Sequence, residues 1–256
     1  MAKEYDVKTY DNWTDGGKDG AHLLTMPNIP HPLHLVNPRT IVGDSQWTRM
    51  RKYCYYDAGY KCQACGRACE KGQCHAHEVY DIDYMTGESR FVRTVCLCPL
   101  CHVAGIHSGR ALTSFKKGDP LMPKSRLLAG AENLFKIIHE WNIAHPDEDP
   151  LRAYDTFLSY AETPAIAKEM SELIEKYDMK FYSSNKGKGT AKWKDWHLIF
   201  GNKRYDTPYE DVEDWQRVMD KKNAKYKKVI EEEHILPIYS EIDAIIAESK
   251  QTKSNP

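Results

Sequence analysis

The stretch CLCPLCHVAGIH, residues 96–107, holds three cysteines and two histidines and carries no other ionisable side chain. Its Cys98-Pro-Leu-Cys101 unit matches an earlier Cys62-Gln-Ala-Cys65, which is followed by a glycine. A Cys-x-x-Cys turn brings two sulfurs to the same side, so two such turns complete a tetrahedral thiolate site. The sequence therefore predicts a structural zinc ion, bound by Cys62, Cys65, Cys98 and Cys101, that stabilises a module too small for a large core.

All eight cysteines lie between Cys54 and Cys101. The N-terminus has no apolar core of the kind found in signal peptides, and no apolar run approaches the roughly 18 residues that span a bilayer. We therefore expect a cytoplasmic protein without membrane contact, whose cysteines are ligands or free thiols rather than disulfides. The remaining cysteines are interpreted as small buried apolar residues, with Cys69 or Cys74 as a ligand if the pairing is different: Cys54, Cys69, Cys74 and Cys96.

The overall composition is that of an ordinary folded protein, with 41% hydrophobic and 29% charged residues. The net charge is -1 and the pI is about 6.8, so the chain lacks the global basic character of many nucleic-acid-binding proteins. Attraction to nucleic acid would have to come from local patches of positive charge. Composition alone leaves the class of partner open.

The pattern along the chain indicates an α+β protein in three parts. Residues 1–50 are rich in Gly, Pro and Asn without sustained periodicity, which predicts an extended N-terminal arm. Residues 51–118 form the zinc-stapled module, and residues 119–256 form a mostly helical region with a short β-hairpin. Apolar residues recur at helical spacing in three stretches of that region: Leu127, Ala131, Leu134, Ile138 and Trp141; Ile166, Met170, Leu173, Ile174 and Tyr177; Val212, Trp215, Met219, Tyr226 and Ile230.

Finer predictions concern the same region. Thr207-Pro208-Tyr209-Glu210 has the pattern of a capping box and predicts the start of a helix. Residues 151–161 predict a short helix, and residues 238–246 predict a last one. The segments KFYSS (180–184) and WHLIFG (196–201) flank a Gly/Lys-rich turn, which predicts a β-hairpin.

The segment HAHEVYD, residues 75–81, lies between the two cysteine pairs. Alternation along a strand would place His75 and His77 on one face and Glu78 on the other. Residues 90–98 predict a second strand, and residues 99–107 a helix that carries His102. A plain zinc ribbon needs no histidines or acids, so this arrangement indicates a second site in which His77 and His102 lie close together.

Three segments carry a resemblance to a known family: GYKCQACG (59–66), HAHEVYD (75–81) and LCPLCHVAGIHSGRA (97–111). Together they resemble the HNH endonucleases, in the zinc-clipped His-x-His-Glu variant of phages and bacteria. The specific match covers residues 51–112. The resemblance implies a ββα-metal fold, hydrolysis of phosphodiester bonds in DNA, and a place in the cytoplasm of a bacterial or phage-infected cell.

The resemblance also implies roles for individual residues. His77 would be the general base that deprotonates water, since a neutral imidazole titrates near the working pH. His102 would be the helix-borne ligand of a catalytic Mg²⁺ or Mn²⁺, which supplies positive charge to the phosphate. Glu78 or His75 would complete that metal site.

His107 would be a further metal ligand or a phosphate contact, and Arg110 would hold the scissile phosphate through two hydrogen bonds. Two departures from the family stand out. Its middle Asn is missing near residues 93–94. His102 and His107 are five residues apart, which places them about 140° apart on an ideal helix unless Gly105 permits a local bulge.

Two groups of lysines are candidates for nucleic-acid binding. Lys116 and Lys117 follow the module, and Lys186 and Lys188 lie in the Gly/Lys turn between two aromatic segments. Such residues contact phosphates, while neighbouring tryptophans either stack on bases or pack in the core. The expected partner is DNA, or RNA. The alternative function is a zinc module without catalysis that binds nucleic acid or protein.

Overall fold

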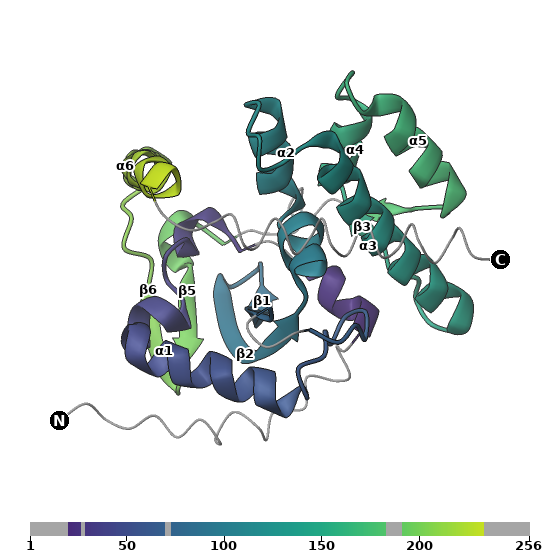
Figure 1. Ribbon diagram of the computed structural model, residues 1–256. Coiled ribbons are helices and arrows are strands. Elements are labelled where there is room, and N and C mark those ends of the chain that lie inside the picture. The colour runs from purple at the N-terminus through teal and green to yellow at the C-terminus, as the bar shows by residue number, and fades with distance from the viewer. Residues whose placement is uncertain (1–19, 27–28, 70–72, 183–190, 233–256) are drawn as a thin grey trace.

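The centre of the computed structural model is an antiparallel hairpin of β1 (His75–Asp83) and β2 (Glu88–Leu97) (Figure 1). The structure describes residues 20–26, 29–69, 73–182 and 191–232, with the last side chain at residue 222. The register pairs His77 with Val95, and a bulge after Val79 pairs Tyr80 with Phe91. Both strands predicted around the histidine segment are confirmed.

Two later strands extend this hairpin into a mixed sheet of order β1-β2-β5-β6. β5 (His197–Phe200) runs parallel to β2 and antiparallel to β6 (Lys203–Asp206). Gly201 and Asn202 both have positive φ (56° and 60°), as a tight two-residue hairpin turn requires. A sheet strand of the C-terminal region therefore lies against the predicted zinc module.

The prediction that residues 180–184 and 196–201 pair in a β-hairpin is wrong. β4 (Phe181–Tyr182) pairs in parallel with β3 (Ala153–Tyr154) in a separate two-stranded sheet, whereas β5 finds its antiparallel partner in β6. The Gly-Asn turn directly after β5 gave the shorter connection, and short connections are favoured. The predicted Gly/Lys turn, with Lys186 and Lys188, lies outside the described residues.

The prediction of an extended N-terminal arm over residues 1–50 is wrong for the part of this segment that the structure describes. This segment begins with two short 3₁₀ helices, η2 (Gly20–Leu24) and η3 (His31–Leu33). Helix α1 then runs over Pro38–Asp57, with a kink at Gly43, whose φ is 78°. Asn37 caps α1, because its side chain accepts a hydrogen bond from Thr40 N at 3.0 Å. The division of the chain into three domains stays a prediction.

Five helices lie between β2 and β4 in the described residues. They are the π-helix η4 (Leu100–Ile106), then α2 (Ser108–Lys116), α3 (Lys124–Ala144), α4 (Thr156–Ala161) and α5 (Ala167–Lys176). α3 confirms the first predicted apolar stripe, since four of its five residues are buried: Leu127, Ala131, Leu134 and Ile138. Figure 1 shows α2 to α5 grouped on one side of the hairpin, and α1 with β5 and β6 on the other.

A 3₁₀ turn, η5 (Trp193–Asp195), precedes β5, and the last described helix, α6 (Val212–Glu232), starts later than predicted. Thr207 Oγ1 accepts a hydrogen bond from Tyr209 N at 3.3 Å, a local turn that competes with a helix start. The predicted helix over residues 238–246 lies outside the described residues.

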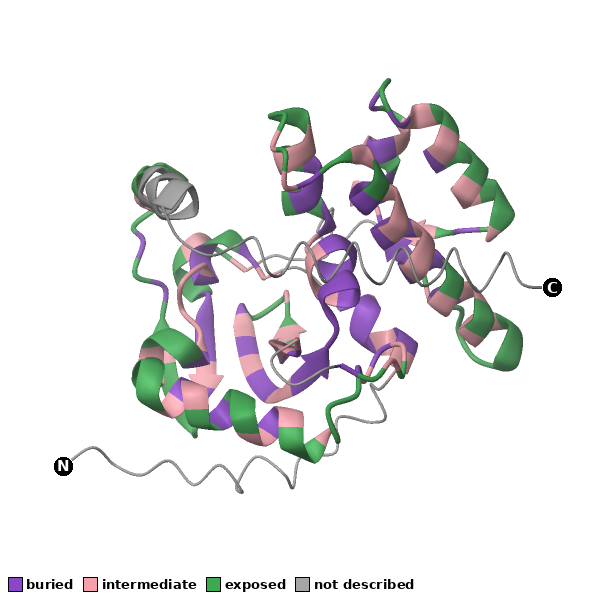
Figure 2. Ribbon diagram, viewed as in Figure 1, coloured by how far each residue is buried: buried purple, intermediate pink, exposed green. Residues whose placement is uncertain are grey.

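Two apolar clusters hold these elements together. The larger one joins the hairpin to η4 and to α3, α4 and α5, and the smaller one packs Trp47 and Met50 of α1 against Phe91, Leu198 and Phe200 of the sheet. Figure 2 shows the buried residues along β2 and at the centre of the molecule, with exposed residues on the outer face of α5. The predicted α+β class is confirmed. None of the described helices combines the length and apolarity needed to cross a bilayer.

Candidate functional site: a four-cysteine cluster beside a histidine triad

The four cysteines of the two Cys-x-x-Cys pairs come together as predicted. The sulfur atoms of Cys62, Cys65, Cys98 and Cys101 all lie within 4.8 Å of one another. The sulfurs of Cys65 and Cys98 are 3.8 Å apart. Tetrahedral zinc with Zn–S bonds of about 2.3 Å separates its sulfurs by about 3.8 Å. The cluster therefore fits a structural zinc ion.

Local structure prepares this cluster for thiolates. Gly66 has a φ of 72°, as expected for the turn after the first pair. The side-chain amide of Asn133 on α3 donates to the sulfur of Cys101 at 3.3 Å, which stabilises a negative sulfur. The shared sulfur contacts hold the pKa of Cys62 below its ordinary value and, together with burial, raise the pKa values of Cys98 and Cys101. Asn133 was missed in the sequence because a single Asn on a helix carries no signal.

The remaining four cysteines are buried, as interpreted from the sequence, and lie outside the metal group that the described residues form: Cys54, Cys69, Cys74 and Cys96. Their thiols pack in the larger apolar cluster beside the zinc cluster. They serve there as small apolar residues.

A second group of metal-ligand type consists of His77, His102 and His107, whose ring nitrogens lie within 4.8 Å of one another. His77 comes from β1, His102 from η4, and His107 from the junction of η4 and α2. The ring centroids of His102 and His107 are 4.6 Å apart, and that of His77 lies 5.3 Å and 5.5 Å from them. The predicted closeness of His77 and His102 is confirmed.

His75 also contacts this triad. Its Nδ1 lies 3.0 Å from Nδ1 of His102, so one ring donates a hydrogen bond to the other. The Nδ1 atom of His102 is therefore engaged in this hydrogen bond, and its Nε2 atom remains available to bind a metal ion. Strand alternation explains the arrangement, because His75 and His77 project from the same face of β1.

The five-residue spacing of His102 and His107 is explained by the π-helix. The amide of His107 donates to the carbonyl of His102 at 3.1 Å, an i to i−5 hydrogen bond. A π-turn widens the helix by one residue per turn, so residues five apart return to the same face. The bulge considered from the sequence is confirmed, and His107 reaches the triad.

The π-helix packs closely on α3 through glycine. A Cβ placed at Gly130 would lie 2.3 Å from Cβ and 2.6 Å from the carbonyl oxygen of Ala104 in η4. No side chain fits between these backbones at that distance. Gly130 is thus a structural requirement of the site that sequence reasoning missed, because a glycine inside a helix carries no sign of its partner.

We expect Gly130→Ala to lower stability by about 1–2 kcal/mol, although alanine favours helix by about 1 kcal/mol, because overpacking against backbone costs up to about 3 kcal/mol. The midpoint of urea unfolding measures the effect. Gly109→Ala is the matched control, since a Cβ there meets only Thr156 Cγ2 at 3.6 Å. Equal stability of the two variants would refute the close packing of α3 on η4.

Burial keeps the histidines neutral. It lowers the pKa of His77 to about 4 and that of His107 to about 3, and it also lowers the pKa values of His75 and His102. Neutral imidazoles have a free lone pair, which both metal binding and general-base catalysis require. The site is therefore ready for either role near neutral pH.

Glu78 is not brought to the triad. It lies on the face of β1 opposite His77, with Ala76 and Tyr80, which pack on the α1 side of the sheet. Burial raises the pKa of the Glu78 carboxyl, and the positive charge of Arg39 in α1 opposes that shift. The prediction that Glu78 completes the metal site is therefore not supported by its position.

Three of the five residues predicted to contact phosphate lie in the part of the chain that the structure describes. Arg110 in α2 is exposed, and its positive charge helps to lower the pKa values of His102 and His107, so it lies near the triad. Lys116 and Lys117 lie at the far end of the same helix, both exposed. Lys186 and Lys188 fall outside the described residues.

No known family, curated protein or solved structure matches the chain.

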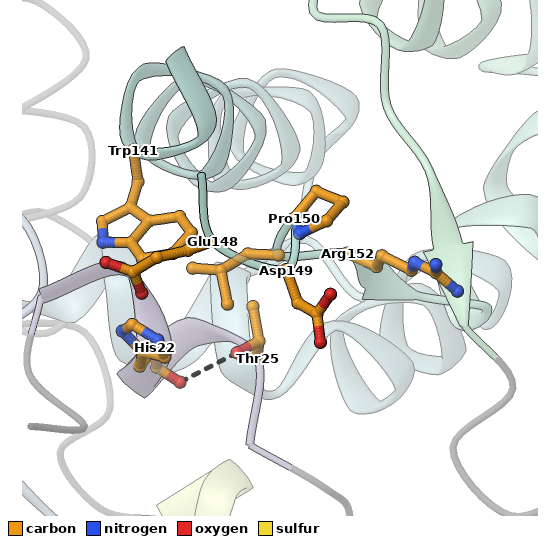
Figure 3. Close-up of a pocket in the computed structure, with 8 residues that line it drawn as sticks. His22, Thr25, Trp141, Glu148, Asp149, Pro150 and Arg152 are labelled. Atoms are coloured by element: carbon orange, nitrogen blue, oxygen red, sulfur yellow. Dashed lines mark hydrogen bonds between the residues drawn. The ribbon is translucent and has the colours of Figure 1, made fainter. Parts of the chain in front are cut away.

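A surface hollow of about 440 Å³ lies apart from the triad, between η2 and the C-terminal end of α3 (Figure 3). Its lining includes none of the triad histidines or zinc-cluster cysteines. The rings of Trp141 and His22 meet edge-to-face with centroids 4.8 Å apart, and Glu148, Asp149 and Arg152 also line the hollow. The candidate reaction site is therefore the histidine triad and not this hollow.

Proposed function

We propose that the protein is a metal-dependent endonuclease of the HNH type that hydrolyses phosphodiester bonds in DNA. The observation that carries the proposal is the meeting of His77, His102 and His107 on a β-hairpin and the following helix, directly beside a four-cysteine zinc cluster. That combination of elements agrees with the ββα-metal resemblance of residues 51–112.

The residues fit a divalent cation bound by imidazole. His102 and His107 would hold it, and His75 would fix the ring of His102 through the hydrogen bond between their Nδ1 atoms. A bound cation would supply positive charge to the phosphate and to the departing oxygen. A set of imidazole ligands suits Ni²⁺ better than Mg²⁺, which prefers oxygen ligands.

His77 has the properties of a general base. Its ring is buried, neutral and next to the two proposed ligands, so it can take a proton from an attacking water. Its nitrogens also lie within reach of the same cation. The variant His77→Ala separates the two roles. If His77 acts only as the base, the variant keeps its affinity for the metal and loses cleavage. If His77 is a metal ligand, the variant loses both.

The proposal is tested by incubating supercoiled plasmid with the purified protein and Mg²⁺, Mn²⁺ or Ni²⁺, beside an EDTA control. We expect metal-dependent conversion to nicked or linear DNA, with His77→Ala slower by about 10²–10⁴-fold. Cutting by His77→Ala at a rate close to that of the wild type would refute its role.

A zinc module without catalysis is the second candidate function. The four-cysteine cluster favours it, since this cluster fits zinc whether or not the histidines bind a metal. No cutting with any of the three metals, together with binding of plasmid, would decide for this alternative.

A further inference from the structure

Gln63 lies inside the first cysteine pair and joins that turn to β2. Its backbone N–H donates to the carbonyl of Cys96 at 2.8 Å, and its side-chain Oε1 accepts a hydrogen bond from the backbone N–H of Cys96, also at 2.8 Å. The backbone N–H and carbonyl of Cys96 are thus both paired with one residue. The carbonyl of Gln63 accepts a hydrogen bond from Gly20 N of η2 at 3.0 Å, so three segments of the chain meet here.

The side chain of Gln63 takes the place of a neighbouring strand. Cys96 lies opposite Ala76 of β1 on one edge of β2, whereas on the other edge β5 pairs with residues 88–90 and does not extend to Cys96. Cys96 is fully buried, so without Gln63 its backbone N–H would lose this partner in a place away from water. An unpaired buried N–H is costly, which accounts for a polar side chain between two cysteines of the cluster.

The contact between Gln63 and Cys96 fixes one cysteine pair relative to the other. Gln63 stands directly after Cys62 and two residues before Cys65, and Cys98 follows Cys96 by two residues. The two hydrogen bonds therefore set the distance between the first pair and the second. The sulfurs of Cys65 and Cys98 lie 3.8 Å apart, as in a tetrahedral zinc site. Groups that hold metal ligands in place in this way raise the affinity for the metal.

We propose that Gln63 is a positioning residue of the zinc cluster, which holds the first cysteine pair on β2 so that the four sulfurs meet around one metal ion. Gln63 does not itself bind the metal, since its Oε1 is engaged by the backbone N–H of Cys96. Loss of this acceptor is expected to weaken metal binding although all four cysteines remain. The inference concerns the four-cysteine cluster and does not depend on nuclease activity.

The test compares Gln63→Met with the wild type. Methionine keeps the length of the side chain and replaces the amide oxygen by a weakly accepting sulfur. Metal-free protein is titrated with Co²⁺, and binding is followed by the thiolate-to-Co²⁺ charge-transfer absorption, which requires cysteine ligands. Zn²⁺ then displaces the bound Co²⁺. Both dissociation constants are expected to rise by about 10–100-fold, and the d–d bands of tetrahedral Co²⁺ are expected to change.

Gln216→Met is the matched control, because this glutamine is exposed on α6, where it donates a hydrogen bond to Asp220. Metal affinities and a Co²⁺ spectrum in Gln63→Met equal to those of the control would overturn the proposal. Equal destabilisation of the metal-free and zinc-loaded protein, with unchanged affinity, would overturn it too, since Gln63 would then only support the fold. A wild type without charge-transfer absorption would overturn it together with the zinc assignment, whereas plasmid cleavage tests the nuclease proposal separately.

Discussion

Cys101→Ser is expected to reduce bound zinc from about one ion per chain to nearly none and to abolish cooperative unfolding of the module. Cys101 is fully buried, and its sulfur lies within 4.8 Å of the other three and accepts a hydrogen bond from Asn133. Structural zinc contributes about 10–16 kcal/mol in small zinc domains, as much as or more than the whole stability of an ordinary domain. Elemental analysis and thermal unfolding followed by circular dichroism measure both effects.

Cys54→Ser is the matched control, since Cys54 is also buried but lies outside the four-cysteine group. It should keep its zinc and lose only about 1–3 kcal/mol of stability, the usual cost of placing a hydroxyl among apolar groups. Full zinc content and unchanged unfolding in Cys101→Ser would show that the cluster does not bind zinc.

His102→Ala is expected to have the largest effect on activity, with the cleavage rate falling on the order of a thousandfold or more. His102 is the centre of the histidine group: it contacts His75 by a hydrogen bond, and its ring lies next to those of His77 and His107. Its loss would remove a metal ligand and the support for the others. Single-turnover cleavage of plasmid at saturating Mn²⁺ measures the rate.

His145→Ala is the control for this variant, because His145 is exposed and stacks only on Trp141 outside the site. Its cleavage rate should equal that of the wild type. His102→Ala should also keep its zinc, since the cysteine cluster does not use the histidine. A rate in His102→Ala within a few-fold of the control would refute the assignment of His102.

The four-cysteine cluster, both strands of the hairpin and the closeness of His77 and His102 were predictable from the sequence. Each depends on local spacing: two cysteines separated by two residues, or side chains that alternate along one strand. The apolar stripe of α3 was predictable for the same reason, because a helix repeats every 3.6 residues. No knowledge of distant contacts was needed for any of them.

Features set by contacts between distant segments could not be predicted. The sequence offered a bulge at Gly105 as one of two possibilities for His107, but the close approach of Gly130 in α3 to Ala104 in the π-helix is encoded by no local pattern. The pairing of β5 with β2 joins residues about a hundred positions apart. For α1 the local signal was present, an Asn cap before Pro38, but the glycines and prolines around it masked the helix.

Binding of Mn²⁺ to the zinc-loaded protein, followed by the EPR signal of free Mn²⁺, tests the central claim most directly. The wild type is expected to remove about one Mn²⁺ per chain from solution, and His102→Ala, with its zinc intact, is expected to remove none. Equal Mn²⁺ binding by the two proteins would contradict the claim that the histidine triad is a metal site.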